Sequence, residues 1–286
     1  MERSGWSVNM VKVITDSTSD VPAELVETLG ITVVPSYVMF GTESYRDGVE
    51  LSREQFYEKL ASAKVIPSTA APPPAVYEQV YRRLAQESEE MVSIHLASRY
   101  SGIYNSAQVA AREVAPDRIA VIDSEQVTMG YGWMVVAAAE AARRGASLEE
   151  IVALVEGMKP RTQVLAALGT LEYLYRGGRV SWVRALVGTL LRIKPIIEVR
   201  MGGINLVERT RTMGRALDRL LALVQDLGPL ERAIVLHANA ADLASDFAGQ
   251  LQQIHPDWAR LIEQAGVTIA SHAGPGAVGV ACVTIP

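Results

Sequence analysis

The chain has 286 residues, of which 49% are hydrophobic and 21% are charged, and its formal net charge at pH 7 is −5. This length suffices for one large or two ordinary hydrophobic cores, and we expect two domains. The acidic balance argues against a nucleic acid partner, because binding to a phosphate backbone depends on clustered Lys and Arg.

The apolar segments are too short to cross a membrane. The longest candidate, Trp133–Ala139, ends at the charged Glu140, whereas a membrane-spanning helix needs about 20 apolar residues. Met1–Met10 is polar and lacks the basic-then-apolar order of a signal peptide. We therefore expect a soluble, cytoplasmic protein. The single cysteine, Cys282, excludes an internal disulfide and is expected to be a buried apolar residue of the run Val278–Ile285.

The first half alternates short β-branched runs with helical patterns. Strands are expected at Val11–Ile14, Ile31–Phe40, Met91–Leu96 and Ile119–Ile122, with helices at Pro22–Leu29 and Ser52–Ser62, over Val76, Val80 and Leu84, and after Ser101. This order predicts an α/β domain with a parallel sheet over residues 1–160. Ligands of such sheets bind at the carboxyl ends of the strands, and the segments after three of these strands are rich in Asp, Ser and Thr.

After about Pro160 the pattern changes, and we expect a separate α+β domain over residues 161–286. It should contain helices around Leu171–Leu191, a hairpin of Lys194–Arg200 with Ile204–Thr210 that turns at Gly202–Gly203, a helix at Met213–Gln225, a strand at Ala233–His237, a helix at Ala240–Gln253, and strands at Val267–Ser271 and Val278–Ile285.

Motifs for cofactors and metals are weak. Gly274, Gly276 and Gly279 match the dinucleotide fingerprint, but that motif must open a helix inside a βαβ unit. Asp16 ends a strand as a phosphoryl-accepting aspartate does, but Thr18 stands where a second carboxylate is expected. The four histidines lack the spacing of a zinc site and are His95, His237, His255 and His272. We therefore expect no metal and no cofactor.

A serine hydrolase acting on lipid esters is the alternative function. Ser101, Asp123 and His272 occur in the chain order of the α/β-hydrolase triad. The Gly-x-Ser-x-Gly elbow that exposes such a serine is missing, because Arg99 stands two residues before Ser101. Chain order alone is weak support for nucleophilic catalysis.

Seven segments stand out together along the chain. They are Val13-Ile14-Thr15-Asp16-Ser17, Pro67-Ser68-Thr69-Ala70-Ala71-Pro72, Ser98-Arg99-Tyr100-Ser101-Gly102-Ile103-Tyr104, Asp123-Ser124 with Met129-Gly130, Leu174-Tyr175-Arg176-Gly177-Gly178-Arg179-Val180, Ile193-Lys194-Pro195-Ile196-Ile197, and His272-Ala273-Gly274-Pro275-Gly276. In this order, from about Val11 to Val280, they resemble the DegV family.

The resemblance implies a fold and a role. Members of the family look like two-domain α/β carriers, with an N-terminal parallel-sheet αβα domain, a C-terminal α+β domain and a fatty acid bound between them. The characterised members serve as the lipid-binding subunit of bacterial fatty acid kinase. The implied role here is to hold one long-chain fatty acid while a separate ATP-binding kinase subunit phosphorylates its carboxylate. This chain would then be a non-catalytic lipid-binding protein.

The resemblance also implies the ligand-binding residues. Thr69, Ser101 and the adjacent Gly102 would hold the carboxylate, with Arg179 and His272 near the head group. Ser98 and Ser17 complete the implied set. The chain departs from the family pattern at Ala70-Ala71, where Ser-Gln is usual, and at Ile103, where Thr is usual. Both departures remove polar side chains near the head group.

Residue chemistry is compatible with this set. Buried carboxylates need donors, which the hydroxyls of Thr69 and Ser101 supply. Ser101 is expected to begin a helix, whose free N–H groups and positive end also favour an anion. Simpler structural roles stay open, namely Ser101 as a helix cap, Arg179 as a solvated turn charge, His272 as a structural histidine, and Asp16 and Asp123 as caps. The second domain is locally basic, and this surface is either a solvated face or a surface for the kinase subunit; its residues are Arg176, Arg192, Arg200, Arg209 and Arg211.

Overall fold

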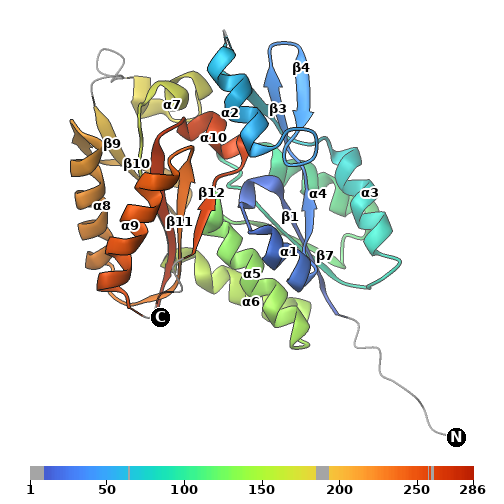
Figure 1. Ribbon diagram of the computed structural model, residues 1–286. Helices are drawn as coiled ribbons and strands as arrows, with labels where there is room; N and C mark the ends of the chain where they lie inside the picture. The colour runs from blue at the N-terminus through green and yellow to red at the C-terminus, as the bar shows by residue number, and fades with distance from the viewer. Residues whose placement is uncertain (1–9, 64, 185–192, 257, 259–260) are drawn as a thin grey trace, which may run out of the picture.

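The computed structural model describes residues 10–63, 65–184, 193–256, 258 and 261–286. Figure 1 shows two α/β halves side by side, the first containing β1 and the second containing β11. This arrangement confirms the expected fold, a parallel-sheet domain followed by an α+β domain. The boundary between residues 160 and 161 stays a prediction. The helices expected around Leu171–Leu191 are confirmed in part by a helix at Glu172–Gly177, whereas residues 185–191, Arg192 and residues 1–9 lie outside the described residues.

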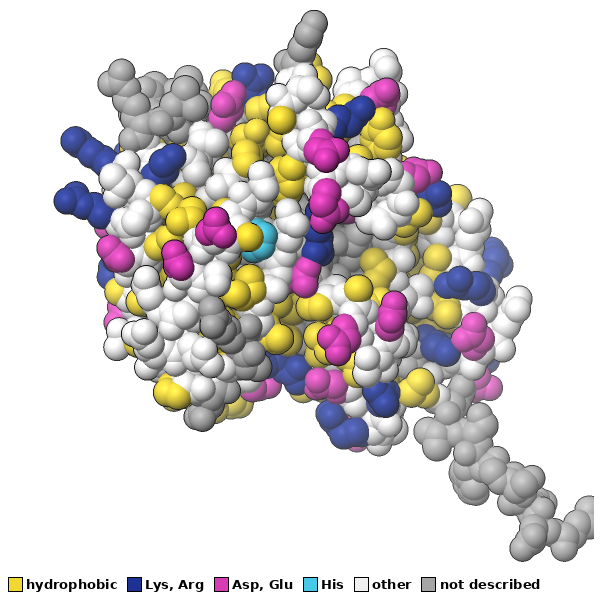
Figure 2. Space-filling view, in the orientation of Figure 1, with side chains coloured by type: hydrophobic (Ala, Val, Ile, Leu, Met, Phe, Trp, Pro, Cys, Tyr) yellow, Lys and Arg dark blue, Asp and Glu magenta, His cyan; other side chains and the backbone are white. Residues whose placement is uncertain are grey.

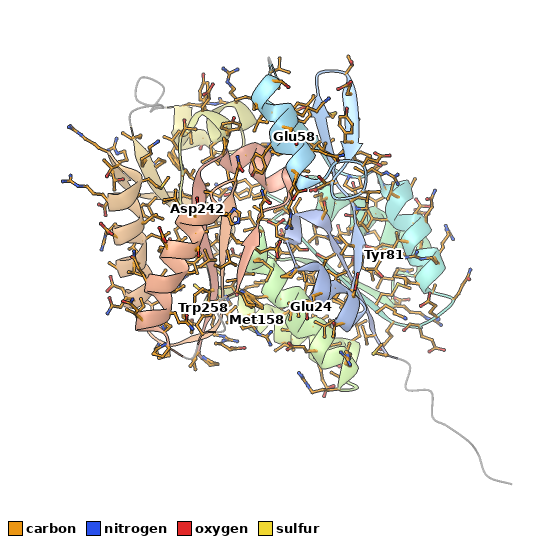
Figure 3. All side chains as sticks on the ribbon, in the orientation of Figure 1. Glu24, Glu58, Tyr81, Met158, Asp242 and Trp258 are labelled. Atoms are coloured by element: carbon orange, nitrogen blue, oxygen red, sulfur yellow. The ribbon has the colours of Figure 1, made fainter. Side chains whose placement is uncertain are left out.

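The first sheet is parallel throughout, as predicted, with the strand order β2-β1-β6-β7. Its strands are β1 (Lys12–Asp16), β2 (Thr32–Val34), β6 (Met91–His95) and β7 (Ile119–Asp123). Its helices are α1 (Ala23–Leu29), α3 (Pro74–Leu84), α4 (Ile103–Val114), α5 (Met129–Arg143) and α6 (Leu148–Met158). Tyr81 of α3, labelled in Figure 3, is fully buried, and its hydroxyl donates to Ser93 Oγ of β6 at 2.8 Å. The helix is thereby fixed on the sheet.

The second sheet is mixed, with the order β10-β9-β8-β13-β11-β12. Its strands are β8 (Thr162–Ala167), β9 (Lys194–Arg200), β10 (Gly203–Thr210), β11 (Leu230–Ala238), β12 (Ile262–Gln264) and β13 (Ala277–Thr284). Two amphipathic helices, α8 (Met213–Asp226) and α9 (Ala241–Ile254), cover one face through side chains such as Leu220 and Phe247. Cys282 is fully buried on β13, as predicted, and burial raises the pKa of its thiol to about 12.

A small third sheet, β4-β3-β5, is formed by the first half of the chain but packs on the second domain. It consists of β3 (Tyr37–Phe40), β4 (Glu43–Arg46) and β5 (Ser68–Ala70), with α2 (Arg53–Ser62) between the last two strands. Val38 and Phe56 are fully buried here, in one cluster with Leu174 of α7 (Glu172–Gly177) and Ala270 of α10 (Val267–Ala273). The run Ile31–Phe40, expected as one strand, is therefore split between two sheets. Pro35 lies at the break, where a missing N–H would weaken a continuous ladder.

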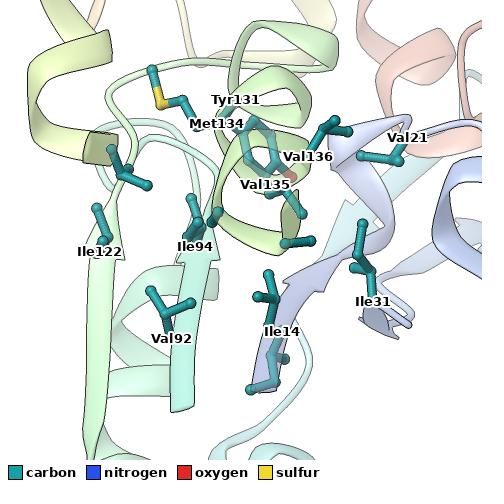
Figure 4. Packing of buried hydrophobic residues seen from close by; sticks show 14 of the residues in the cluster. Ile14, Val21, Ile31, Val92, Ile94, Ile122, Tyr131, Met134, Val135 and Val136 are labelled. Atoms are coloured by element: carbon teal, nitrogen blue, oxygen red, sulfur yellow. The ribbon is translucent and has the colours of Figure 1, made fainter. Parts of the chain in front are cut away.

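Helix α5 lies between the two large sheets. Every residue of α5 except Glu140 and Arg143 is buried, as expected for a helix that is apolar on all sides. Figure 4 shows Tyr131 and Met134 of α5 packed over Ile14 and Ile94 of the first sheet. On the other side, Trp133 Nε1 donates to the carbonyl of Ala281 on β13 at 3.1 Å. Among the described residues, no helix combines the length and apolar character needed to cross a bilayer.

At three further places the structure differs from the local prediction. Val267–Ser271 is helical rather than extended, because the carboxylates of Asp20 and Asp47 accept hydrogen bonds from the N–H groups of Gly266 and Thr268 and so stabilise the first turn of α10. The β9–β10 hairpin is confirmed, but the residues with positive φ in its turn are Met201 (46°) and Gly202 (69°), one position earlier than expected. Helix α4 begins at Ile103 with Gly102 as its N-cap, and Ser101 Oγ accepts from Ile103 N at 3.3 Å.

Candidate functional site

A cavity of about 260 Å³ lies between the two domains. Its floor is the face of the second sheet that α8 and α9 leave uncovered. Val164 and Ala166 of β8 and Ile197 and Val199 of β9 line it, because alternate residues of a strand point to the same face. The intervening residues, such as Leu165, belong to the core beneath α8 and α9. The two-residue period therefore supplies an apolar floor on one side and a core on the other.

The other walls come from segments far apart in the sequence. They are Thr69–Ala71 at the end of β5, Leu96 and Tyr100–Ile103 after β6, Val127 and Thr128 before α5, and Thr268, Ile269, His272 and Ala273 of α10. The sequence indicated candidate ligand contacts after three strands of the first sheet. Cavity-lining residues follow two of these strands, β6 and β7. Most of these side chains are apolar.

One part of the lining is polar and contains five of the predicted ligand-binding residues. These are Thr69, Ser101, Gly102, Arg179 and His272. Thr69 Oγ1 lies 3.0 Å from His272 Nε2, which joins the two domains at this point. The loops of Thr69 and Ser101 are neighbours, because a Cβ built on Gly102 would lie 3.8 Å from Cβ of Ala71. We call these five residues the mouth.

The mouth favours an anion. None of the described residues that line the cavity is Asp or Glu. Burial, and to a smaller degree the positive charge of Arg179, lower the pKa of His272 to about 4. Burial also lowers the pKa of His237, the other histidine of the lining. At neutral pH the guanidinium of Arg179 is therefore the one formal charge among the described lining residues.

The ring of His272 is held from two sides. On one side Thr69 forms the hydrogen bond to Nε2. On the other side Gly177 packs so closely that a Cβ at this position would lie 2.5 Å from Nδ1. A side chain at residue 177 would displace the imidazole, which explains a glycine at the end of α7. Arg179 NH1 donates to the carbonyl of Gly177 at 2.6 Å, so the same turn positions both groups.

Two predicted ligand-binding residues, Ser17 and Ser98, are not among the residues that line this cavity. Ser17 lines a second cavity, where its hydroxyl lies 2.7 Å from Ser36 Oγ and donates to Asp47 Oδ2 at 3.1 Å. Ser98 donates its backbone N–H to Asp123 Oδ1 at 3.1 Å. Contact of these two serines with a ligand stays a prediction.

The residues of the possible hydrolase triad make other contacts. Among the hydrogen bonds of the described residues, none joins Ser101, Asp123 and His272 to one another. The carboxylate of Asp123 accepts from backbone N–H groups of Ser98 and Glu125, at 3.1 Å each. A pKa of about 4 also leaves His272 a poor general base. The geometry therefore does not support this alternative.

Asp16 has a structural role. It caps the 3₁₀ turn Ser17–Ser19 and is fully buried, with His95 Nδ1 at 2.9 Å and the hydroxyl of Tyr131 at 2.8 Å. Burial by itself would raise the pKa of this carboxyl, but the hydrogen bonds from His95, Thr18 and Tyr131 outweigh it and hold the pKa below its ordinary value. The capping alternative is correct for this residue.

Sequence reasoning did not single out Tyr100 and Thr128, two polar residues of the lining that connect separate segments. The hydroxyl of Tyr100 donates to the carbonyl of Gly202 at 3.0 Å and accepts from Ile204 N at 2.9 Å, which attaches the β9–β10 hairpin to the first domain. Thr128 precedes α5 and bonds to Asp20. These pairs are about 100 residues apart in the chain, so no local pattern could have indicated them.

Known proteins with similar sequences and structures cover nearly the whole chain. Residues 10–284 match the DegV family model. A DegV domain-containing protein of Deinococcus radiodurans is 36% identical over 276 residues, which is 95% of this chain and 97% of that protein. The structure of a fatty-acid-binding DegV family protein from Thermus thermophilus has a TM-score of 0.86 and 31% identity, covering 96% of this chain and 100% of the other. A stearic-acid-binding protein from Eubacterium ventriosum has a TM-score of 0.88 and 26% identity, covering 96% and 98%.

The fold and the site define a two-domain α/β protein that encloses an apolar cavity between its domains, with a polar mouth that favours an anion. The chain belongs to the DegV family.

The pKa of His272 should depend on Arg179. In Arg179→Ala, the pKa of His272 is expected to rise toward the ordinary value, because a positive neighbour that opposes protonation is removed. An NMR titration of the His272 ring measures it. Arg176→Ala is the control, since this arginine pairs with Glu172 at 3.0 Å and is not a cavity-lining residue. An unchanged or lower pKa in Arg179→Ala would contradict the electrostatic account of the mouth.

Proposed function

We propose that this protein binds one long-chain fatty acid in the cavity between its domains, with the carboxylate at the mouth. The observation that carries the proposal is the composition of the lining. An extended set of apolar side chains ends at two hydroxyls and one guanidinium, and none of the described lining residues bears a carboxylate. An amphiphile with a long apolar tail and an anionic head matches both parts.

The acyl chain supplies most of the affinity. Removing about fifteen methylenes from water contributes ~0.8 kcal/mol each, or on the order of 10 kcal/mol before the costs of ordering the ligand. The head group needs only enough donors to replace the water that it loses, because an unpaired buried polar group costs roughly 1 to 3 kcal/mol. Thr69, Ser101 and the mouth charge of Arg179 provide such donors.

Two relatives support this ligand class. The Thermus thermophilus protein is described by its fatty acid binding and the Eubacterium ventriosum protein by its binding of stearic acid. Both share the fold of this chain over almost its full length. The ligand of this chain is accordingly proposed to be a free fatty acid rather than an ester.

We further propose that the bound acid is presented to a separate ATP-binding kinase subunit, which forms the acyl phosphate. In this role the protein is a carrier and supplies no catalytic group of its own. Arg179 is exposed at the mouth, where it can meet both the carboxylate and a partner that docks there. His272 is neutral at pH 7 and can donate or accept a hydrogen bond without adding charge.

Native mass spectrometry tests the proposed ligand. Protein purified from a heterologous host should carry one acyl chain per polypeptide, because so large an apolar area dissociates slowly from water-excluding walls. Delipidated protein should regain one equivalent of added stearic acid. Protein that is empty after purification and takes up no added acid would refute the proposal.

Loss of the mouth hydroxyls should weaken the binding of the carboxylate. Thr69→Val and Ser101→Ala are each expected to raise the Kd for stearic acid about tenfold, which corresponds to ~1.4 kcal/mol for one donor. Displacement of a fluorescent fatty acid measures this. Octadecanol is the matched control ligand, and its Kd should change by less than about threefold because it carries no charge to be stabilised. Unchanged Kd values for stearic acid in both variants would refute the assigned mouth.

Arg179 and His272 should matter more for phosphate transfer than for acid binding. In a reconstituted assay with the kinase subunit, Arg179→Ala and His272→Ala are expected to reduce acyl phosphate formation by about tenfold or more. The Kd for the acid should rise by less than about threefold in Arg179→Ala, since water screens an exposed charge. Arg176→Ala serves as a control on the adjacent turn. Normal acyl phosphate formation in both variants would contradict the presentation role.

A further inference from the structure

Thr128 has a backbone conformation that its side chain disfavours. Its φ of 48° and ψ of −146° fall in a region that is almost restricted to glycine, and Thr is β-branched, which makes the crowding worse. The residue lies at the N-cap of α5 and lines the cavity. Such a conformation persists only where surrounding contacts impose it.

The contact that holds Thr128 is a buried carboxyl. Thr128 Oγ1 donates to Asp20 Oδ2 at 2.5 Å, and Asp20 is 4% exposed. The other oxygen, Asp20 Oδ1, accepts from the backbone N–H of Gly266 at 2.8 Å. A Cβ at Gly266 would lie 2.6 Å from this oxygen, so only glycine allows the carboxyl to approach the start of α10. Asp20 therefore joins two elements that belong to different domains.

Both of these elements form walls of the cavity. Thr128 lines it directly, and α10 contributes Thr268 two residues after Gly266 and His272 one turn later. Asp20 itself is not among the lining residues. Its carboxyl thus lies behind the wall at the point where the two domains meet. We call the set Asp20, Thr128 and Gly266 the brace.

We propose that Asp20 is a positioning residue for the acid-binding cavity: through the brace it holds the strained turn at Thr128 and the first turn of α10 at a fixed separation. This inference rests on the proposed function and adds to it the group that keeps the walls apart. The brace acts on the walls of the cavity and not on the carboxylate of the ligand. It therefore sets the affinity for the acyl chain equally in a fatty acid and in a fatty alcohol.

The charges around Asp20 are compatible with this role in either protonation state. Burial raises the pKa of Asp20 to about 7, and the nearby Asp47 adds to the rise, while Thr128, Arg53 and Gly266 oppose it. Arg53 of α2 forms an ion pair with Glu263 of β12, which joins the two domains. On the face shown in Figure 2, acidic and basic side chains follow one another between the two halves of the molecule. An ionised carboxyl accepts from Thr128, and a protonated one can donate to the same hydroxyl. The brace therefore does not require a charge.

Substitutions separate the brace from the mouth. Asp20→Ala removes both contacts, and Thr128→Val removes the hydroxyl while keeping the shape of the side chain. Each is expected to raise the Kd for stearic acid and for octadecanol by the same factor, about tenfold. The double variant should bind no more weakly than Asp20→Ala, because both changes remove one interaction. Asp20→Asn should stay within about threefold of the unchanged protein, since its amide can accept from Gly266 and donate to Thr128.

Backbone hydrogen exchange gives a second measurement that needs no ligand. Asp20→Ala should accelerate exchange around residues 127–130 and 266–269, whereas Asp20→Asn should not. The inference is overturned if Asp20→Ala binds both ligands normally, if it weakens the acid but not the alcohol, if the two changes add, or if exchange at the two segments is unchanged. If the unchanged protein binds neither ligand, the proposed function fails, and the exchange result alone then decides whether the brace exists.

Discussion

The placement of α5 between the two large sheets is the constraint on which the rest of the structure depends. An apolar cavity in water tends to collapse, because its walls gain free energy by meeting each other. Here α5 is buried on all sides and bonds through Trp133 to Ala281 of the second sheet, so it acts as a spacer that both domains must accommodate. The space that remains beside it, lined by the uncovered face of β8 and β9, is the cavity.

The chemistry of the mouth depends both on the side chains that line the cavity and on the acidic side chains that the fold places elsewhere. Many Asp and Glu residues are present in the chain, yet among the described residues none lines the cavity. The two histidines of the lining are kept neutral at pH 7 by burial, so Arg179 is not opposed by a negative charge nor accompanied by a second positive one. In the proposed function, a single carboxylate is held there without producing a highly charged site, next to the exposed side chain of Arg179.

The segment Asp16–Asp20 illustrates how a motif can serve a site without touching its ligand. Asp16 pairs with His95 inside the first domain, Ser17 bonds to Ser36 and Asp47, and Asp20 reaches Thr128 and Gly266. Two of these partners, Ser36 and Thr128, line the cavity. Buried polar groups need hydrogen-bond partners. Here these hydrogen bonds connect the segment after β1 to Ser36, to Thr128 and to Gly266 at the start of α10.

The sequence by itself determined the helical and strand periods and the hairpin of the second domain, because these are local properties. The alternation of strands and helices along the first half also implied a parallel sheet. The resemblance of whole segments to the DegV family implied the five residues that the structure brings together at the mouth. Only the tertiary structure decided that Val267–Ser271 is a helix, since its β-branched residues favour a strand until Asp20 and Asp47 bind its first N–H groups. The same holds for the meeting of Thr69 with His272 and of Asp20 with Thr128, because contacts between residues 100 or more positions apart depend on how the domains pack rather than on any local preference.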